Sequence, residues 1–285
     1  MTMLQMPRRP APPVAAGKPK VACPSIGKIE TDGVKAVRMA VNAVEGFGKT
    51  TIAAYAPNPL IIETRDETGY ETLLSAGLVP SVDVARVSVW DELLAVLDQA
   101  QNTEHQTIAI DAATTAEKMC HEHVCTRDFN GDWSERGFSS YQKGYELAVK
   151  DWEVMLSMLD KIHRLRHANI IILVHARMRT FNDPAGPSFD RYEGDLHKKT
   201  WASTARWADV VLFGTFATVV VNQRTAKGEQ VGKGKGIGTG ERVIHTTRRD
   251  AWEAKNRYGM ADTIELHDVG PAETWARIWS EITHK

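Results

Sequence analysis

The sequence predicts an α/β fold in which helices flank a mostly parallel sheet that continues into an antiparallel extension. Up to Asp209, short apolar runs alternate with helical patterns, which is typical of parallel strands joined by crossover helices. After Asp209 the apolar runs follow one another with no helix between them, which indicates antiparallel strands. The 285 residues suffice for one large domain with appendages.

The expected elements follow in chain order. Strands are expected at Val37–Val41, Leu60–Glu63, Ala85–Val89, Thr107–Asp111 and Ile170–Val174, and in the extension at Val210–Phe213, Val219–Asn222 and Val243–Thr246. Helices are expected at Asp91–Gln101, at Ala113–Thr126 and at about Tyr141–His167. The glycine-rich stretch Lys227–Gly240 predicts a mobile loop. A final helix over Pro271–His284 carries Trp275, Ile278, Trp279 and Ile282 on one face, so we expect it to dock on the domain or on a neighbour.

Residues 1–30 are expected to form a disordered basic tail, ahead of a core domain at 31–269 and the final helix at 270–285. Met1–Lys20 holds five prolines, four cations and no acidic residue. The tail is either a solvated segment without function or a weak nucleic-acid contact. The three cysteines are too few for a disulfide framework, and no apolar run approaches the length of a membrane span. We therefore expect a cytoplasmic protein with no membrane partner.

A phosphate-binding loop is predicted where the first expected strand ends. The run from Asn42 to Thr51 reads NAVEGFGKTT, and a strand before it and a helix after it would direct backbone N–H groups and the helix dipole at one anion. Lys49 would reach the β- and γ-phosphates of ATP, and the Thr50 hydroxyl would join the shell of Mg²⁺. The expected nucleotide-binding residues are Glu45, Gly46, Phe47, Gly48, Lys49, Thr50 and Thr51.

The loop departs from the pattern G-x-x-x-x-G-K-[ST] at one position, because Ala43 stands where the first glycine belongs. If the turn requires a positive φ there, alanine costs on the order of 1 kcal/mol and weakens nucleotide binding. The alternative is a glycine-containing turn that merely resembles a phosphate-binding loop.

Metal-binding and catalytic groups are predicted at the ends of later strands. Asp111 ends a short apolar strand and would hold Mg²⁺ together with Thr50. Hydrolysis also needs a group that orients the attacking water. Glu67, just beyond the second strand, is the first choice and Glu63 the second. For either, a surface salt bridge is the alternative.

His175 follows the strand Ile170–Val174, where a polar side chain could sense the γ-phosphate and pass its presence to the next loop. The alternative is a histidine that caps the strand end. The run from Cys120 to Cys125 reads CHEHVC and raises a structural zinc as a weaker hypothesis, because only some of these side chains share a helix face.

Two further segments carry a family resemblance. One begins at Ile171–Arg177 and continues through Asp190–Glu193, Leu196–Lys199 and Trp207–Phe213; the other is Trp252–Gly259. Together with the loop they resemble the phage AAA-type nucleotide-binding proteins of RecA-like fold, whose studied members act as Sak-type single-strand annealing recombinases. The likeness covers about Val34–Leu266. It implies a RecA-like P-loop NTPase core.

The run Lys255-Asn256-Arg257-Tyr258-Gly259 resembles the KNRFG motif of the RadA branch, with Tyr in place of Phe. In that branch the basic residues reach the nucleotide of an adjoining subunit. The resemblance therefore implies a ring or filament with ATP between its subunits, in which Lys255 and Arg257 are catalytic in trans. An exposed basic turn is the alternative.

RecA-like proteins contact DNA with mobile loops, and two candidates follow from this. The stretch Arg177–Lys199 is expected to be such a loop, with Arg177, Arg179, Lys198 and Lys199 for phosphates and Phe181, Phe189 and Tyr192 for base stacking. Its four acidic residues weaken this interpretation. The stretch Arg224–Arg257 has nine cations against four acids, and Lys233 and Lys235 stand between glycines that let them follow a phosphate backbone. A solvated hairpin loop is the alternative.

We therefore expect a Mg²⁺-dependent, DNA-stimulated ATPase that assembles on single-stranded DNA and promotes recombination or strand annealing. The expected partners are single-stranded DNA and further copies of the chain, and a single-strand DNA-binding protein is a further candidate. The rival hypothesis is a nucleotide-dependent switch or loader in replication or repair that turns over ATP weakly.

Overall fold

The computed structural model describes residues 27–28, 33–183, 186–221 and 235–283. The chain divides into two units, Met1–Asp32 and Gly33–Lys285, and all helices and strands named below belong to the second. Apart from Gly27 and Lys28, the predicted tail lies outside the described residues. None of the described helices is both long enough and apolar enough to cross a membrane.

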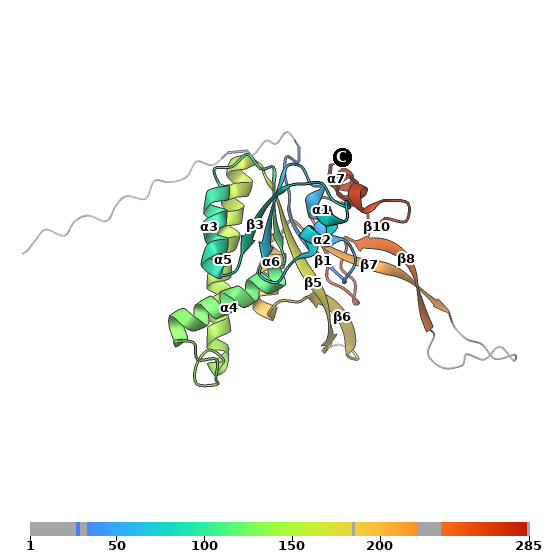
Figure 1. Cartoon of the computed structure of the whole chain (residues 1–285). Coiled ribbons are helices and arrows are strands. Elements are labelled where there is room, and N and C mark those ends of the chain that lie inside the picture. Colours follow the sequence, from blue (N-terminus) through green and yellow to red (C-terminus); the bar gives the residue numbers. More distant parts are fainter. Residues whose placement is uncertain (1–26, 29–32, 184–185, 222–234, 284–285) are drawn as a thin grey trace, which may run out of the picture. The chain divides into compact units, whose positions relative to one another are not determined.

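A ten-stranded sheet runs through the second unit, in the order β10-β8-β7-β1-β5-β4-β2-β3, with β6 paired to β5 and β9 to β7 (Figure 1). The strands are β1 (Arg38–Ala43), β2 (Pro59–Thr64), β3 (Asp83–Val87), β4 (Thr107–Asp111), β5 (Asn169–Phe181), β6 (Phe189–Gly194), β7 (Val210–Val221), β8 (Lys235–His245), β9 (Lys255–Asn256) and β10 (Thr263–Glu265). The strands from β7 to β3 in this order are parallel, whereas β6, β8, β9 and β10 pair antiparallel. The predicted fold class is confirmed.

Helices cover both faces of the sheet (Figure 1). One face packs against α1 (Lys49–Ala54), α2 (Gly69–Ser75) and α7 (Thr274–Thr283). The other packs against α3 (Trp90–Ala100), α4 (Ala113–Phe129), α5 (Lys143–Arg166) and α6 (Lys198–Trp207). Two short 3₁₀ segments, Ser140–Gln142 and Pro271–Glu273, precede α5 and α7. The predicted docking of the final helix is confirmed, because Trp275, Ile278 and Ile282 are buried in the core that α1 shares.

The expectation of a loop over Arg177–Lys199 is wrong. β5 continues to Phe181, pairs with β6 as a hairpin, and is followed by α6, which the sequence analysis missed. The first turn of α6 lacks a capping side chain of its own. Instead, the backbone N–H of His197 donates to both carboxylate oxygens of Glu117 on α4, at 2.9 and 2.8 Å. A helix start that depends on a carboxylate 80 residues away leaves no local capping signal.

The antiparallel extension is also longer than predicted. Val210–Val221 forms one strand rather than two, and Lys235–Gly240, expected as part of a loop, belongs to β8. Backbone hydrogen bonds join the two strands, with Val221 opposite Lys235. Such pairing does not require apolar side chains. Because this segment consists mainly of glycine and lysine, it lacks the alternation of apolar residues by which a strand is predicted.

Candidate functional site

The predicted phosphate-binding loop has the geometry that its sequence suggested. β1 lies between β5 and β7 and ends at Ala43, and α1 begins at Lys49. Between them, Gly46 and Gly48 have φ angles of 72° and 101°. Residues with a Cβ rarely adopt such angles, so glycine is required at both positions.

The loop contacts the neighbouring strand β7. The N–H of Val44 donates to the carbonyl of Gly214 at 3.1 Å. The ring of Phe47 is buried against Gly214, where an added Cβ would lie 2.6 Å from the ring. Phe47 therefore anchors the loop with its side chain, and its backbone N–H donates to the Val44 carbonyl at 3.4 Å. The side chain of Glu45 is exposed.

Ala43 does not strain the loop. It is the buried last residue of β1, and it is not among the described residues with positive φ. The concern that a missing glycine weakens nucleotide binding therefore has no support in the backbone geometry.

Lys49 is a nearly buried cation directed at the loop itself. Its ammonium donates to the carbonyls of Ala43 and Val44 at 3.2 and 3.5 Å. Burial lowers its pKa, and the negative charges of Asp111, Glu67 and Glu45 partly oppose that shift. A buried ammonium held only by long bonds to carbonyls is well suited to receive an anion.

Asp111 meets the start of α1 across the sheet. The Thr50 hydroxyl donates to the Asp111 carboxylate at 2.6 Å, although 61 residues separate the two. Burial raises the pKa of Asp111 to about 6, whereas the bond from Thr50 opposes that shift. A hydroxyl and a carboxylate are the hard oxygen ligands that Mg²⁺ prefers, and Mg²⁺ commonly takes only one or two protein ligands beside water and phosphate. These residues fit the metal.

Glu67 and His175 come together beside this pair. The Nε2 atom of His175 lies 3.4 Å from Glu67 Oε1, which also accepts a bond from the Thr115 hydroxyl at 3.4 Å. The bond with His175 is the main cause that lowers the pKa of Glu67. The N–H of His175 donates to the hydroxyl of Thr114. Two threonines in the first turn of α4 thus hold the predicted catalytic groups.

Glu63 has a different environment. It is buried within β2, and one carboxylate oxygen pairs with Arg86 at 3.1 Å. Its other oxygen has no hydrogen-bond partner in the described part of the chain. The geometry therefore favours Glu67 over Glu63 as the group that orients water.

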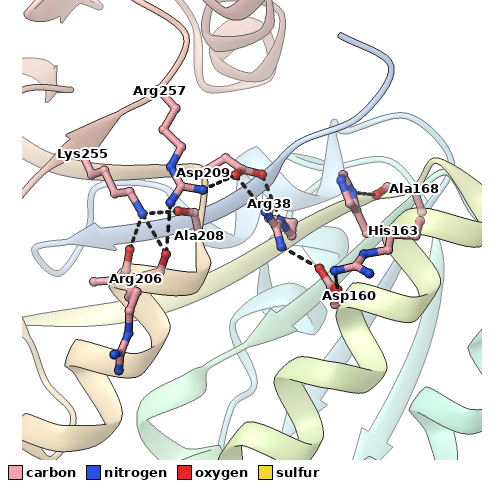
Figure 2. A network of polar contacts seen from close by, with 11 residues as sticks. Arg38, Asp160, His163, Ala168, Arg206, Ala208, Asp209, Lys255 and Arg257 are labelled. Carbon is pink, nitrogen blue, oxygen red and sulfur yellow. Dashed lines mark hydrogen bonds and ion pairs between the residues drawn. The ribbon is translucent and has the colours of Figure 1, made fainter. Parts of the chain in front are cut away.

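Lys255 and Arg257 lie at the opposite edge of the sheet from the loop. β9 pairs with the first residues of β7, beside the start of β1, whereas the loop leaves the end of β1. Six residues of strand separate the two edges, which is about 16 Å. Figure 2 shows Arg257 on Asp209 and Lys255 on the end of α6. Neither side chain can reach the loop of its own subunit.

The predicted DNA-binding residues have different environments. Arg177 pairs with Asp195 at 3.3 Å, Arg179 donates to the Leu196 carbonyl at 2.8 Å, and Lys199 pairs with Glu146 at 2.5 Å. Lys233 lies outside the described residues, and only the backbone of Lys235 is described.

The aromatic side chains of the hairpin already contact other side chains of the protein. The guanidinium of Arg191 lies 4.0 Å from the ring centre of Phe181 and 5.2 Å from that of Phe189. The ring of Tyr192 stacks on Phe213. Each ring that was expected to stack on bases is already in contact with the protein.

A cationic groove runs beside α6. Two adjoining hollows of about 340 and 510 Å³ share Trp201, Ala205, Arg248 and Glu253. We call them together the α6 groove. Six cations and two acids line it: Arg179, Arg191, Lys198, Arg206, Arg248, Lys255, Glu193 and Glu253. Across the described ranges, the side chains of Lys198, Arg206 and Arg248 have no ion-pair partner.

The structural zinc hypothesis finds no support. No group of three or more potential metal-binding side chains occurs among the residues that the structure describes. Cys120 and Cys125 are buried free thiols, and burial raises the pKa of both. His121 packs edge-on against Tyr145, and burial lowers its pKa to about 4.

Comparison with protein families agrees with this geometry. The model of a family described as AAA domain matches residues 35–258. The chain belongs to the AAA domain family. No curated protein matches the chain. The match covers the phosphate-binding loop, Asp111, the hairpin of β5 and β6, and the residues from Lys255 to Tyr258, so the chain carries an AAA-type P-loop NTPase domain.

Sequence reasoning missed three groups at this site. Thr114 touches His175 and Thr115 touches Glu67, but nothing in their local sequence distinguishes them. Arg242 donates to the Phe47 carbonyl at 3.5 Å and to Val269 and Thr274 at 2.8 and 3.2 Å, so it ties the loop to the segment before α7. It lies 195 residues beyond Phe47, and only the folded chain joins them.

The raised pKa of Asp111 predicts a pH-dependent stability difference. Without nucleotide and metal, the folded state keeps the proton up to pH about 6, whereas the unfolded state loses it near the ordinary value of 3.8. The folded wild type therefore loses stability as pH rises through this range. Relative to wild type, Asp111→Asn should gain about 1.4 kcal/mol of stability between pH 5 and 7.5, measured by urea unfolding in EDTA. Asp268→Asn, which is exposed, is the control. A difference that stays constant with pH would show that the Asp111 carboxyl is not desolvated.

Proposed function

We propose that this protein is a Mg²⁺-dependent ATPase that assembles with copies of itself on single-stranded DNA. The observation that carries the ATPase is the convergence of Lys49, Thr50, Asp111 and Glu67 at one edge of the sheet. Lys49 would bind the β- and γ-phosphates, and Thr50 and Asp111 would hold Mg²⁺. Mg²⁺, when bound, neutralises charge on the phosphate oxygens.

Glu67 is the group that would position water and accept its proton. It lies beyond β2, half-exposed, where its carboxylate is held by Thr115 and His175. Since His175 heads the extended part of β5, a phosphate that moves its side chain would act directly on the hairpin.

Glu67→Gln and Glu63→Gln distinguish the two carboxylates. Glu67→Gln should keep ATP affinity and lower turnover by about 10²–10⁴, because an amide cannot accept the proton of water. Glu63→Gln should retain turnover within about threefold but lose stability, since Arg86 loses its buried partner. Phosphate release and ATP titration measure both. The reverse pattern would assign the role to Glu63.

Arg257 supports assembly. A cation at the far edge of the sheet cannot serve its own nucleotide, but in a head-to-tail assembly that edge meets the loop of the next subunit. An arginine that arrives only on assembly stabilises charge on the transferring phosphoryl group. This is the arrangement that the resemblance to RadA-type sequences implies.

The α6 groove supports the nucleic-acid partner. Its lining has an excess of four positive charges. Within the described part of the chain, Lys198, Arg206 and Arg248 have no ion-pair partner. A groove of this kind tracks a phosphate backbone without reading bases. The role in recombination or strand annealing, in association with a single-strand DNA-binding protein, rests on the resemblance to Sak-type phage proteins.

Salt dependence tests the groove. Lys198→Ala with Arg248→Ala should weaken binding to single-stranded DNA and flatten the plot of log affinity against log salt by up to about 1.4 units, at about 0.7 per lost phosphate contact. Lys233→Ala with Lys235→Ala tests the glycine-rich stretch in the same way. Lys118→Ala with Lys161→Ala removes equal charge elsewhere and should change nothing. An unchanged slope in the first pair would exclude the groove.

The rival function is a nucleotide-dependent loader with weak turnover. The unstrained backbone at Ala43 and the contacts of Glu67 remove two reasons for expecting weak turnover. Phosphate release that rises with added single-stranded DNA supports the ATPase that acts on DNA. Release that is slow and indifferent to DNA favours the loader.

A further inference from the structure

The turn from Lys255 to Gly259 is held by contacts within its own subunit. Lys255 and Asn256 pair with the start of β7. The Asn256 side chain accepts a bond from the N–H of Tyr258 and donates to the Met260 carbonyl, both at 3.0 Å. Gly259 has a φ of 68°, which favours glycine. These contacts therefore fix the backbone of the turn at Arg257.

Lys255 is fully engaged within the subunit. Its ammonium donates to the carbonyls of Ala205, Arg206 and Ala208, at 2.8, 2.9 and 2.6 Å (Figure 2). An ammonium has three N–H donors, so these bonds use all of them. The acceptors are carbonyls at the end of α6, where the helix dipole also favours a cation. Lys49, by contrast, makes only two bonds, at 3.2 and 3.5 Å.

Arg257 is held much more loosely. It is half-exposed and makes one short bond, from Nη1 to Asp209 at 2.8 Å, and one long bond, from Nη2 to the Arg206 carbonyl at 3.5 Å. Asp209 also accepts two bonds from Arg38, at 3.0 and 2.9 Å. Figure 2 shows Asp209 between the two arginines. Arg257 can therefore leave for a phosphate while Asp209 stays paired with Arg38.

We propose that Lys255 is a positioning residue that acts through Arg257, and that Arg257 alone of the two reaches the neighbour's nucleotide. Lys255 fixes the end of α6, from which Asp209 follows directly, and Asp209 orients Arg257. This inference rests on the proposed trans role of Arg257. It differs from the resemblance to RadA-type sequences, which implies that both cations reach the nucleotide.

The first test uses dilute protein without nucleotide, with the monomer verified by sedimentation. Lys255→Met should lower the melting temperature by about 4–8 °C, because three carbonyls at the end of α6, two of them in partly buried bonds, lose their donor. Arg257→Gln and the exposed control Lys118→Met should shift it by less than about 2 °C. A monomer contains no neighbouring nucleotide, so an unchanged melting temperature in Lys255→Met would overturn the assignment.

The second test is a double-variant comparison of turnover by assembled full-length protein, below all melting transitions. Lys255→Met should lower kcat about 10–100-fold with little change in KM, since a displaced arginine fails mainly in the transition state. Arg257→Gln should lower kcat by about 10³ or more. In the double variant, kcat should equal that of Arg257→Gln within about twofold, because Lys255 has no other route to the nucleotide.

If kcat of the double variant falls below that of Arg257→Gln by the full factor seen for Lys255→Met alone, Lys255 acts on the neighbour's nucleotide independently, and the inference is overturned. A kcat at the wild-type level in Lys255→Met would likewise contradict it and leave a purely structural lysine. Wild-type turnover in assembled Arg257→Gln would instead contradict the proposed function. The melting test reports on Lys255 separately, so the two failures are distinguishable.

Discussion

Lys49 and Asp111 are two nearly buried charges that the fold holds close to each other without pairing them. Desolvation shifts the pKa of both toward the neutral form, and the attraction between the two charges opposes that shift only in part. Their hydrogen bonds are to neutral groups, the loop carbonyls for Lys49 and the Thr50 hydroxyl for Asp111. Buried charges without a direct ion-pair partner lower the stability of the fold. They favour the binding of a phosphate and a metal ion, because these ligands supply the missing partners. Much of the surrounding architecture serves to hold them in place.

The parallel sheet provides that constraint. β1 carries the loop, β4 ends in Asp111, and β2 leads to Glu67 at the same edge. His175 lies within β5, opposite Ala43 at the end of β1. Outside β1, the loop is fixed by Gly214 beneath Phe47 and by Arg242 from the segment before α7. At the opposite edge, Lys255 holds the end of α6, and Asp209 pairs with both Arg38 and the exposed side chain of Arg257.

The parts that the sequence predicted correctly are those with local signals. The phosphate-binding loop, the strand that ends in Asp111 and the long helix α5 each follow from a pattern within a few neighbouring residues. The parts that were missed depend on distant contacts. α6 starts on a carboxylate supplied by α4, and Arg242 reaches the loop from the antiparallel extension. The hairpin of β5 and β6 is largely polar and looked like a loop, because its pairing relies on backbone bonds.

The most direct test of the account is complementation between two inactive variants. Lys49→Ala removes the cation of the loop, and Arg257→Ala removes the cation of the far edge, so each should be inactive alone. In an equal mixture, roughly a quarter of head-to-tail interfaces would join an intact loop to an intact arginine. ATP hydrolysis should then partly return. If fluorescence shows that mixed assemblies form and the mixture stays as inactive as its components, the site is not shared between subunits.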